Sequence, residues 1–141
     1  KGIILNRLGK HQEAIECFDR AVKIDPAHGL SWYNMGYALS KLNRREEAIQ
    51  CYDRALNIDQ RDVDAWYSKG YNLATLGRYE KAIQCYDMTL KINPRYAYAW
   101  AGKGIALHQL GKRKEAMKCL HKALEIDPSL RENLASLLAS E

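Results

Sequence analysis

The sequence predicts an all-α solenoid, a stack of helix-turn-helix repeats with a period of 34 residues, on three observations. Tryptophan returns at this constant spacing, at Trp32, Trp66 and Trp100. Each period holds two stretches whose apolar residues recur every three or four positions, as on one face of a helix. Glycine and proline fall between these stretches at fixed places. A period of this length with two helices per unit predicts stacked repeats that share one continuous core.

The first helix of each repeat is predicted by its apolar face and by the break that follows it. In the second repeat, Trp32, Leu39 and Leu42 fall on one helical face, and the tryptophans are expected to fill the seams between repeats. A residue that tolerates left-handed backbone comes next, as is usual where a helix closes. The residues at this break are Gly9, Asn43, Gly77 and Gly111.

The second helix of each repeat is predicted in the same way. In the second repeat, Ala48, Tyr52 and Leu56 recur at helical spacing. Small residues such as Gly36 and Ala48 mark places where two helices approach closely. Proline then stops the helix and holds the preceding residue extended. The prolines are Pro26, Pro94 and Pro128, and Gln60 takes their place after the second repeat. We therefore expect the turn at Gln60 to be less sharply defined.

The segment after the last proline predicts a helix that closes the stack. Ser129 and Glu132 have the spacing of a capping box. Leu130, Leu134 and Leu138 follow on one helical face. We expect a capping helix from about 130 to 139, because the last unit of a repeat array must shield the core.

The motifs W-x-x-[MK]-G, L-G, A-x-x-x-[FY]-x-x-A and D-P, in this order within the period, resemble the tetratricopeptide repeat. The resemblance makes 1–141 one such domain, with a partial repeat at 1–28, full repeats at 29–62, 63–96 and 97–130, and the capping helix. It implies a right-handed α-solenoid that serves as a scaffold for protein partners, without catalysis or cofactor. Departures from the motif that affect local packing are Asn43, Gln60, Thr89 and Leu120. Because the chain opens inside a helical pattern without methionine, we expect a fragment of a longer protein.

The four cysteines share the repeat spacing, which raises the question of a metal or redox site. They are Cys17, Cys51, Cys85 and Cys119. Equivalent residues of stacked repeats lie about 10 Å apart, beyond the roughly 7 Å between Cα atoms that a disulfide spans. No CxxC or HxxxH spacing suited to zinc occurs. We interpret the cysteines as small, partly buried apolar residues and predict no metal site. Unpaired thiols favour a reducing, cytoplasmic location.

Enzymatic and membrane motifs are missing from the sequence. There is no glycine-rich phosphate loop, GxSxG or HExxH motif, so we predict no enzymatic activity. Charged residues interrupt every apolar run well before the roughly 18 residues of a bilayer span, so no membrane insertion is expected. The formal net charge of +5 is mild, and both signs are interspersed, unlike a nucleic-acid-binding protein.

A binding groove is predicted from the resemblance, which places the second, fifth, sixth, ninth, twelfth and thirteenth residues of each repeat on the concave face. These residues are Leu30, Tyr33, Asn34, Tyr37, Ser40, Lys41, Asp64, Tyr67, Ser68, Tyr71, Ala74, Thr75, Tyr98, Ala101, Gly102, Ile105, His108 and Gln109. They include five of the nine tyrosines, a residue enriched in interfaces because its broad ring ends in a polar tip.

We therefore predict that the groove binds a peptide or helix through apolar or aromatic anchors of that partner. The predicted contacts are Tyr33, Asn34, Tyr37, Tyr67, Tyr71, Asn72, Tyr98, Ile105 and His108. The alternative, compatible with the first, is that the rings only pack on one another along the inner wall. Relatives that grip acidic chaperone tails use lysine, asparagine and arginine at positions held here by Tyr33, Tyr37, Ser68, Tyr98 and Gly102, so such a carboxylate clamp is not expected.

Two further functions stay open. Self-association is suggested by the partial first repeat, which would leave Ile3, Ile4 and Leu5 exposed. A basic edge that follows the break in each repeat suggests RNA or an acidic partner. Its residues are Lys10, Arg44, Arg78 and Lys112. The plainer interpretation is that these cations complement the dipole of the first helix and stay solvated, and the interleaved glutamates argue against nucleic acid.

Overall fold

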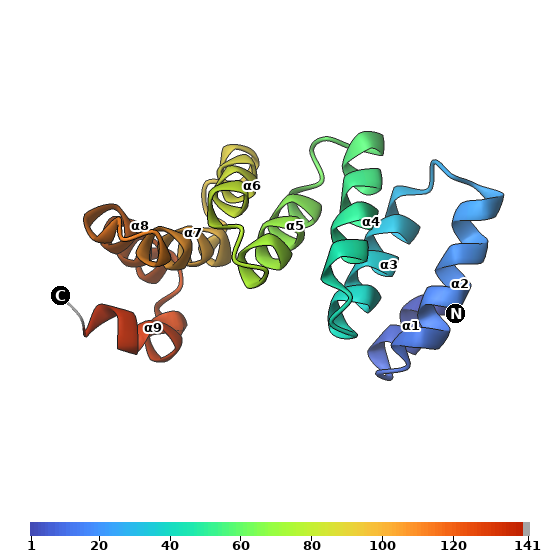
Figure 1. Ribbon diagram of the computed structural model, residues 1–141, viewed down its shortest axis with the longest axis horizontal. Coiled ribbons are helices and arrows are strands. Elements are labelled where there is room, and N and C mark those ends of the chain that lie inside the picture. Colours follow the sequence, from blue (N-terminus) through green and yellow to red (C-terminus); the bar gives the residue numbers. More distant parts are fainter. Residues whose placement is uncertain (140–141) are drawn as a thin grey trace.

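The computed structural model describes residues 1–139 and consists of helices packed in successive pairs (Figure 1). The pairs are α1 (Gly2–Arg7) with α2 (His11–Ile24), α3 (Gly29–Lys41) with α4 (Arg45–Ile58), α5 (Val63–Thr75) with α6 (Tyr79–Ile92), and α7 (Ala97–Gln109) with α8 (Arg113–Ile126). A 3-10 turn, η1 (Pro128–Leu130), leads into α9 (Arg131–Leu138), which lies below α7 and α8 in Figure 1. The predicted all-α solenoid is confirmed.

Each first helix closes with the same hydrogen-bonded turn, a Schellman motif. After α3, the Asn43 N–H donates to the Ser40 carbonyl at 3.0 Å, and the Arg44 N–H donates to the Leu39 carbonyl at 2.9 Å. Asn43 has φ of 61°, and the glycines at the equivalent positions have φ between 76° and 78°. The prediction that these residues supply left-handed backbone is therefore correct, and asparagine serves as well as glycine in forming the turn.

Substitutions at Asn43 test this backbone requirement. Asn43→Ala should lower the free energy of unfolding by about 1 kcal/mol, because a Cβ without a local polar group is strained in the left-handed region. Asn43→Gly should preserve or slightly raise stability, since glycine adopts this conformation freely. Chemical denaturation followed by circular dichroism gives both values. An alanine variant as stable as the glycine variant would contradict the strain argument.

The turns between repeats are held by a side chain and a tryptophan, which corrects the expectation for Gln60. At this turn the Arg61 N–H donates to Asp59 Oδ1 at 3.0 Å, and Trp66 Nε1 donates to the Gln60 carbonyl at 2.9 Å. The turns at Pro26 and Pro94 make the same two kinds of bond at 3.1 Å and 2.9 Å. Asp59 is as extended as its equivalents, with φ of −137°. The Gln60 turn is therefore as well defined as the others.

Small residues let the two helices of a repeat approach, as predicted. A Cβ added to Gly36 would lie 2.9 Å from the Tyr52 ring and 3.2 Å from the Ala48 carbonyl oxygen. Ala48 and Ala55 are fully buried. Trp66 packs against the core clusters on both sides of it, so it fills a seam between repeats. The core is continuous along the stack because each seam is filled in this way.

Ion pairs also join successive repeats, between the second helix of one repeat and the first helix of the next. Lys69 pairs with Asp53 at 2.6 Å, and Lys103 pairs with Asp87 at the same distance one repeat later. The Lys69 and Lys103 side chains are partly buried. Each pair links the second helix of one repeat to the first helix of the next, and so adds to the packing across the seam.

The C-terminal helix packs against α7 and α8, but it begins differently from the prediction. Ser129 does not cap α9: its Oγ donates to Asp127 Oδ1 at 2.6 Å within the preceding turn, and α9 starts at Arg131 without a side-chain cap. Leu130 and Leu134 are buried against α7 and α8. None of the helices in residues 1–139 has the length and apolarity needed to cross a membrane.

Candidate functional site

The candidate site lies on the inner face of the stack. Contacts join α3 to α5 and α5 to α7, and they exceed those between the second helices of successive repeats, so the first helices form the inner wall. Six residues of these helices make up what we call the tyrosine trough. They are Tyr33, Tyr37, Tyr67, Tyr71, Tyr98 and Ile105.

The trough combines packed rings with exposed rings. Tyr67 lies at its centre, with ring centroids 5.1 Å from Tyr96 and 6.3 Å from Tyr98. Tyr71 and Tyr98 are 48% and 55% exposed. Some of the rings therefore pack on one another, as the alternative interpretation expects, and others leave part of their surface exposed to solvent.

A cavity of about 330 Å³ opens at the C-terminal end of the trough, between α5, α7 and α9. We call it the C-terminal cavity. Its walls carry no charged side chain and come from Tyr67, Tyr71, Ala74, Thr75, Tyr79, Tyr86, Tyr98, Ala101, Gly102, Ile105, Gln109, Leu130, Asn133 and Leu134. Its size and apolar walls suit one large apolar side chain of a bound segment.

A second cavity, of about 310 Å³, adjoins the first and shares Tyr67 and Tyr71 with it. We call it the N-terminal cavity. Its walls are more polar and come from Tyr33, Tyr37, Ser40, Lys41, Tyr52, Tyr67, Ser68, Tyr71, Asn72 and Tyr96. The two cavities therefore lie next to each other along α3, α5 and α7, with Tyr67 and Tyr71 between them.

Several wall residues were not predicted as contacts. Tyr52 and Tyr86 belong to second helices and form the floor, and Leu134 brings α9 into the site. Gly102 admits the Tyr86 ring, since a Cβ there would lie 2.6 Å from Tyr86 Cζ. The signal available in the sequence was the tyrosine at the buried position of α4 and of α6, which becomes a cavity floor only when the two helices of a repeat pack together.

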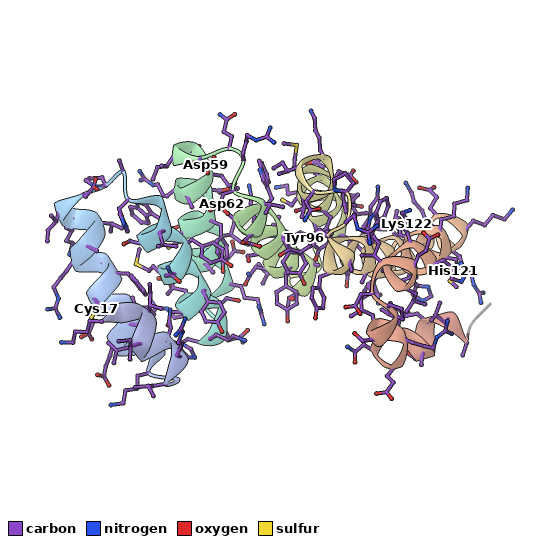
Figure 2. The ribbon with its side chains drawn as sticks, turned by 180° about the vertical axis from the view of Figure 1, so that it is seen from behind. Cys17, Asp59, Asp62, Tyr96, His121 and Lys122 are labelled. Carbon is purple, nitrogen blue, oxygen red and sulfur yellow. The ribbon has the colours of Figure 1, made fainter. Side chains whose placement is uncertain are left out.

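Tyr96 was also missed by the sequence analysis. This residue lies directly before α7, near the middle of the stack (Figure 2). Its hydroxyl donates to Asp64 Oδ1 at 3.0 Å, which ties α7 to α5. Burial raises the pKa of Tyr96, as it raises that of Tyr33, and it raises the pKa of Tyr67 to about 12. These phenols are neutral at physiological pH, as an ordinary tyrosine is, and burial keeps them neutral to higher pH.

The structure places the predicted polar contacts Asn34, Asn72 and His108 in three different surroundings. Asn72 is only 1% exposed: its Nδ2 donates to the Ser68 carbonyl at 2.8 Å, and its Oδ1 accepts from Ser40 Oγ at 2.9 Å. Asn34 turns back to its own helix, where Nδ2 donates to the Leu30 carbonyl. His108 lines neither cavity. Asn72 is therefore a structural residue of the cavity wall, contrary to its predicted role.

The predicted basic edge is largely neutralised. Arg44 pairs with Glu47, Lys10 lies 3.8 Å from Glu13, and Arg78 pairs with Glu46 of the preceding repeat. The hydrogen bond between Arg44 and Glu47 raises the pKa of Arg44 and lowers the pKa of Glu47. Residues paired in this way offer little free charge to RNA, so the site is better sought in the trough.

A larger cavity, of about 780 Å³, lies away from the trough between α4, α5 and α6. Its wall includes the ion pair between Asp53 and Lys69 together with Arg61 and Lys91. We do not favour this cavity as the binding site, although it is larger. Two of its charged groups, Asp53 and Lys69, already pair with each other, and its walls carry no exposed aromatic ring of the kind found in the trough.

The cysteines are packing residues, as interpreted from the sequence. All four are free; Cys51, Cys85 and Cys119 are buried, and Cys17 is partly exposed on α2 (Figure 2). Burial raises the pKa of Cys51 and Cys85 to about 11 and also raises the pKa of Cys119. No cluster of three or more His, Cys, Asp and Glu side chains within residues 1–139 is arranged to hold a metal ion.

Comparison with known proteins agrees with this architecture. Two crystal structures of MamA are 29% identical to the chain; they cover 93% of it, and the chain covers 77% and 72% of theirs, with TM-scores of 0.87 and 0.85. MamA from Desulfovibrio magneticus RS-1, from its residue 41 onward, is 23% identical over 90% of this chain and 72% of that one, with a TM-score of 0.85, and supports the fold.

No curated protein sequence matches the chain. Three family models described as tetratricopeptide repeat match residues 1–61, 33–97 and 73–139, and between them they span the described chain. The chain belongs to the tetratricopeptide repeat family.

Proposed function

We propose that the protein binds a segment of a partner protein in the tyrosine trough, with an apolar or aromatic side chain of that segment seated in the C-terminal cavity. Its family and its structural neighbours make it a protein-interaction scaffold, of a kind that is typically non-catalytic. The observation that carries the finer proposal is that Tyr71 and Tyr98, about half exposed, border an open apolar cavity of about 330 Å³. Tyrosines in such a position dominate many interfaces.

The proposal predicts that binding depends on the exposed rings. The protein would be screened against an array of synthetic peptides that carry a single phenylalanine or leucine anchor among polar residues. Affinity for the peptides it retains would then be measured by fluorescence anisotropy. The double variant Tyr71→Ala with Tyr98→Ala should bind about tenfold or more weakly, because interface tyrosines commonly contribute more than 1 kcal/mol each.

Ile24→Ala is the matched control, because Ile24 is an apolar residue that is 86% exposed and lies in neither cavity. It should bind like the parent protein, and circular dichroism should show both variants folded. Equal affinity of the double tyrosine variant and the parent protein would place binding outside the trough.

Self-association is the second candidate, and one observation favours it. Ile3 and Ile4 on α1 and Leu8 directly after it are 42%, 60% and 67% exposed, which leaves an apolar strip at the N-terminal end of the stack. Such a strip in one copy is a suitable contact for another copy. Sedimentation at high micromolar concentration should then show a dimer that Ile4→Ser dissociates, whereas a monomer would remove this candidate.

A further inference from the structure

The cavity of about 780 Å³ between α4, α5 and α6 combines an apolar floor with positively charged walls. We call it the seam cavity, because its wall includes Trp66, which fills the seam between the second and third repeats. Leu56, Met88 and Ile92 supply further apolar surface. Sites for small molecules typically have volumes of roughly 300 to 1,000 Å³. The seam cavity is therefore large enough for a small organic molecule.

Three cations border the seam cavity, and two of them are free. Lys69 pairs with Asp53 at 2.6 Å, and its Nζ lies 5.7 Å from the centroid of the Trp66 ring. Arg61 and Lys91 make no ion pair with any residue that the structure describes. Both side chains are exposed at the rim. The cavity therefore keeps two positive charges that no carboxylate of residues 1–139 neutralises.

The carboxylates nearest to these two residues in the sequence are engaged elsewhere. Asp87, one turn before Lys91 on α6, pairs with Lys103 of the next repeat at 2.6 Å. Asp59, on the same turn as Arg61, accepts the Arg61 backbone N–H at 3.0 Å and does not line the cavity. A cleft whose free charges share one sign attracts ions of the opposite sign. An anion that enters the seam cavity would meet this field.

Met88 keeps the floor of this cavity apolar, whereas the equivalent residues of the neighbouring repeats are cations. One repeat earlier, Arg54 holds the place of Met88, and its guanidinium lies 5.7 Å from the centroid of the Trp32 ring. One repeat later, Lys122 holds it and pairs with Glu125 at 3.1 Å. At both neighbouring seams a charged side chain therefore occupies the position that is apolar here.

We infer that the seam cavity binds a small organic anion, whose apolar body lies against Trp66 and Met88 and whose carboxylate or phosphate contacts Arg61 and Lys91. Arginine offers either anion a flat fork of donors, and lysine offers a point charge. The indole and the thioether present polarisable apolar surface to the rest of the ligand. This site lies away from the tyrosine trough, so the inference goes beyond the proposed function.

The three tryptophans provide a test of position, because each of them lies at a different seam. The probes are 2-naphthoate, its uncharged counterpart 2-naphthamide, octanoate and inorganic phosphate. Each probe is titrated into the protein while the indole N–H signals are followed by nitrogen-15 NMR, with Trp66→Phe to assign one signal. We expect 2-naphthoate to shift the Trp66 signal in a saturable way and to leave the signals of Trp32 and Trp100 nearly unchanged.

The same titrations test the chemistry of the ligand. We expect 2-naphthoate to bind about tenfold more tightly than 2-naphthamide, because hydrogen bonds to a charged group are stronger than those to a neutral one. Inorganic phosphate has no apolar body and should not shift the Trp66 signal at the same concentrations. Tighter binding of octanoate than of 2-naphthoate at the same signal would identify the preferred body as an acyl chain, and the reverse would identify it as a ring.

Two double variants with the same net charge test the cations. Arg61→Gln with Lys91→Gln should bind 2-naphthoate no more tightly than 2-naphthamide. Arg95→Gln with Lys23→Gln is the matched control, because it removes the same two charges at equivalent, exposed positions that do not line the cavity. The control should keep the tenfold preference, and circular dichroism should show both variants folded.

The remaining outcomes would overturn the inference. Equal shifts of all three indole signals would show that the anions bind without preference for this seam. Equal affinity for 2-naphthoate and 2-naphthamide, a response to inorganic phosphate as strong as that to 2-naphthoate, or no saturable binding of either organic anion would each contradict the proposed ligand. Loss of 2-naphthoate binding in the double variant Tyr71→Ala with Tyr98→Ala would place the anion in the trough instead.

Discussion

Trp66→Ala should lower the free energy of unfolding by about 3 to 5 kcal/mol, the cost of removing a large aromatic ring from a packed site. The indole packs against the core clusters on both of its sides, so its loss leaves a gap in the seam between the second and third repeats. Because repeat proteins are stabilised largely by contacts between neighbours, we also expect the two halves to unfold less cooperatively. Urea denaturation followed by circular dichroism would show a lower midpoint and a broader transition.

Trp66→Phe separates packing from hydrogen bonding in this prediction. Phenylalanine keeps much of the apolar contact but removes the N–H that donates to the Gln60 carbonyl at 2.9 Å. Its expected cost is smaller, about 1 to 2 kcal/mol, since that carbonyl lies at an exposed turn where water can replace the donor. Equal losses in the two variants would show that the hydrogen bond, and not the seam packing, carries the effect.

The fold was predictable because its signal repeats. Trp66, Gly36 and Ala48 each stand for a column of equivalent residues, and a packing requirement that returns every 34 residues is visible without a structure. Gln60 shows the limit of this reasoning. The missing proline ring suggested a looser turn, but the Asp59 side chain and the tryptophan indole hold that turn as they hold the others.

The site was predictable only along single helices. The resemblance to the repeat family implied that Tyr71 and Tyr98 lie on the inner wall, because it assigns fixed positions of each first helix to that face. The burial of Asn72 does not follow from it, because it depends on Ser40 and Arg45 reaching it from the preceding repeat. The floor formed by Tyr86 likewise arises only when helices from different parts of the chain pack together.

The buried thiols predict that the protein loses stability as the pH rises above about 8.5. In the unfolded chain a cysteine has a pKa near 8.5, whereas burial raises the pKa of Cys51 and Cys85 to about 11. The folded pKa is the higher one, so the stabilising contribution is complete below the unfolded value and is lost as pH rises toward the folded value. At pH ~9.5 the loss is about 1 to 1.5 kcal/mol for each thiol, or roughly 2 to 3 kcal/mol together.

Between pH ~7 and ~9.5, the expected change in the free energy of unfolding comes mainly from the thiols and little from the tyrosines. Tyr52, Tyr67 and Tyr86 also have pKa values raised by burial, but an unfolded tyrosine titrates near pH 10 and adds little below that value. The double variant Cys51→Ala with Cys85→Ala should therefore be less stable at pH ~7 but show a much flatter dependence on pH. Urea denaturation at a series of pH values gives both curves.

Alkylation of the native protein by iodoacetamide is an independent test of whether burial protects the Cys51 and Cys85 thiols. At pH ~8, Cys17 should react first because it is partly exposed, and Cys51 and Cys85 should react about a hundredfold more slowly than in urea. If the double alanine variant kept the full pH slope, the loss of stability would have to come from other groups. If Cys51 or Cys85 were alkylated as fast in the native state as in urea, burial would not protect it, and the interpretation of the cysteine column as packing would fail.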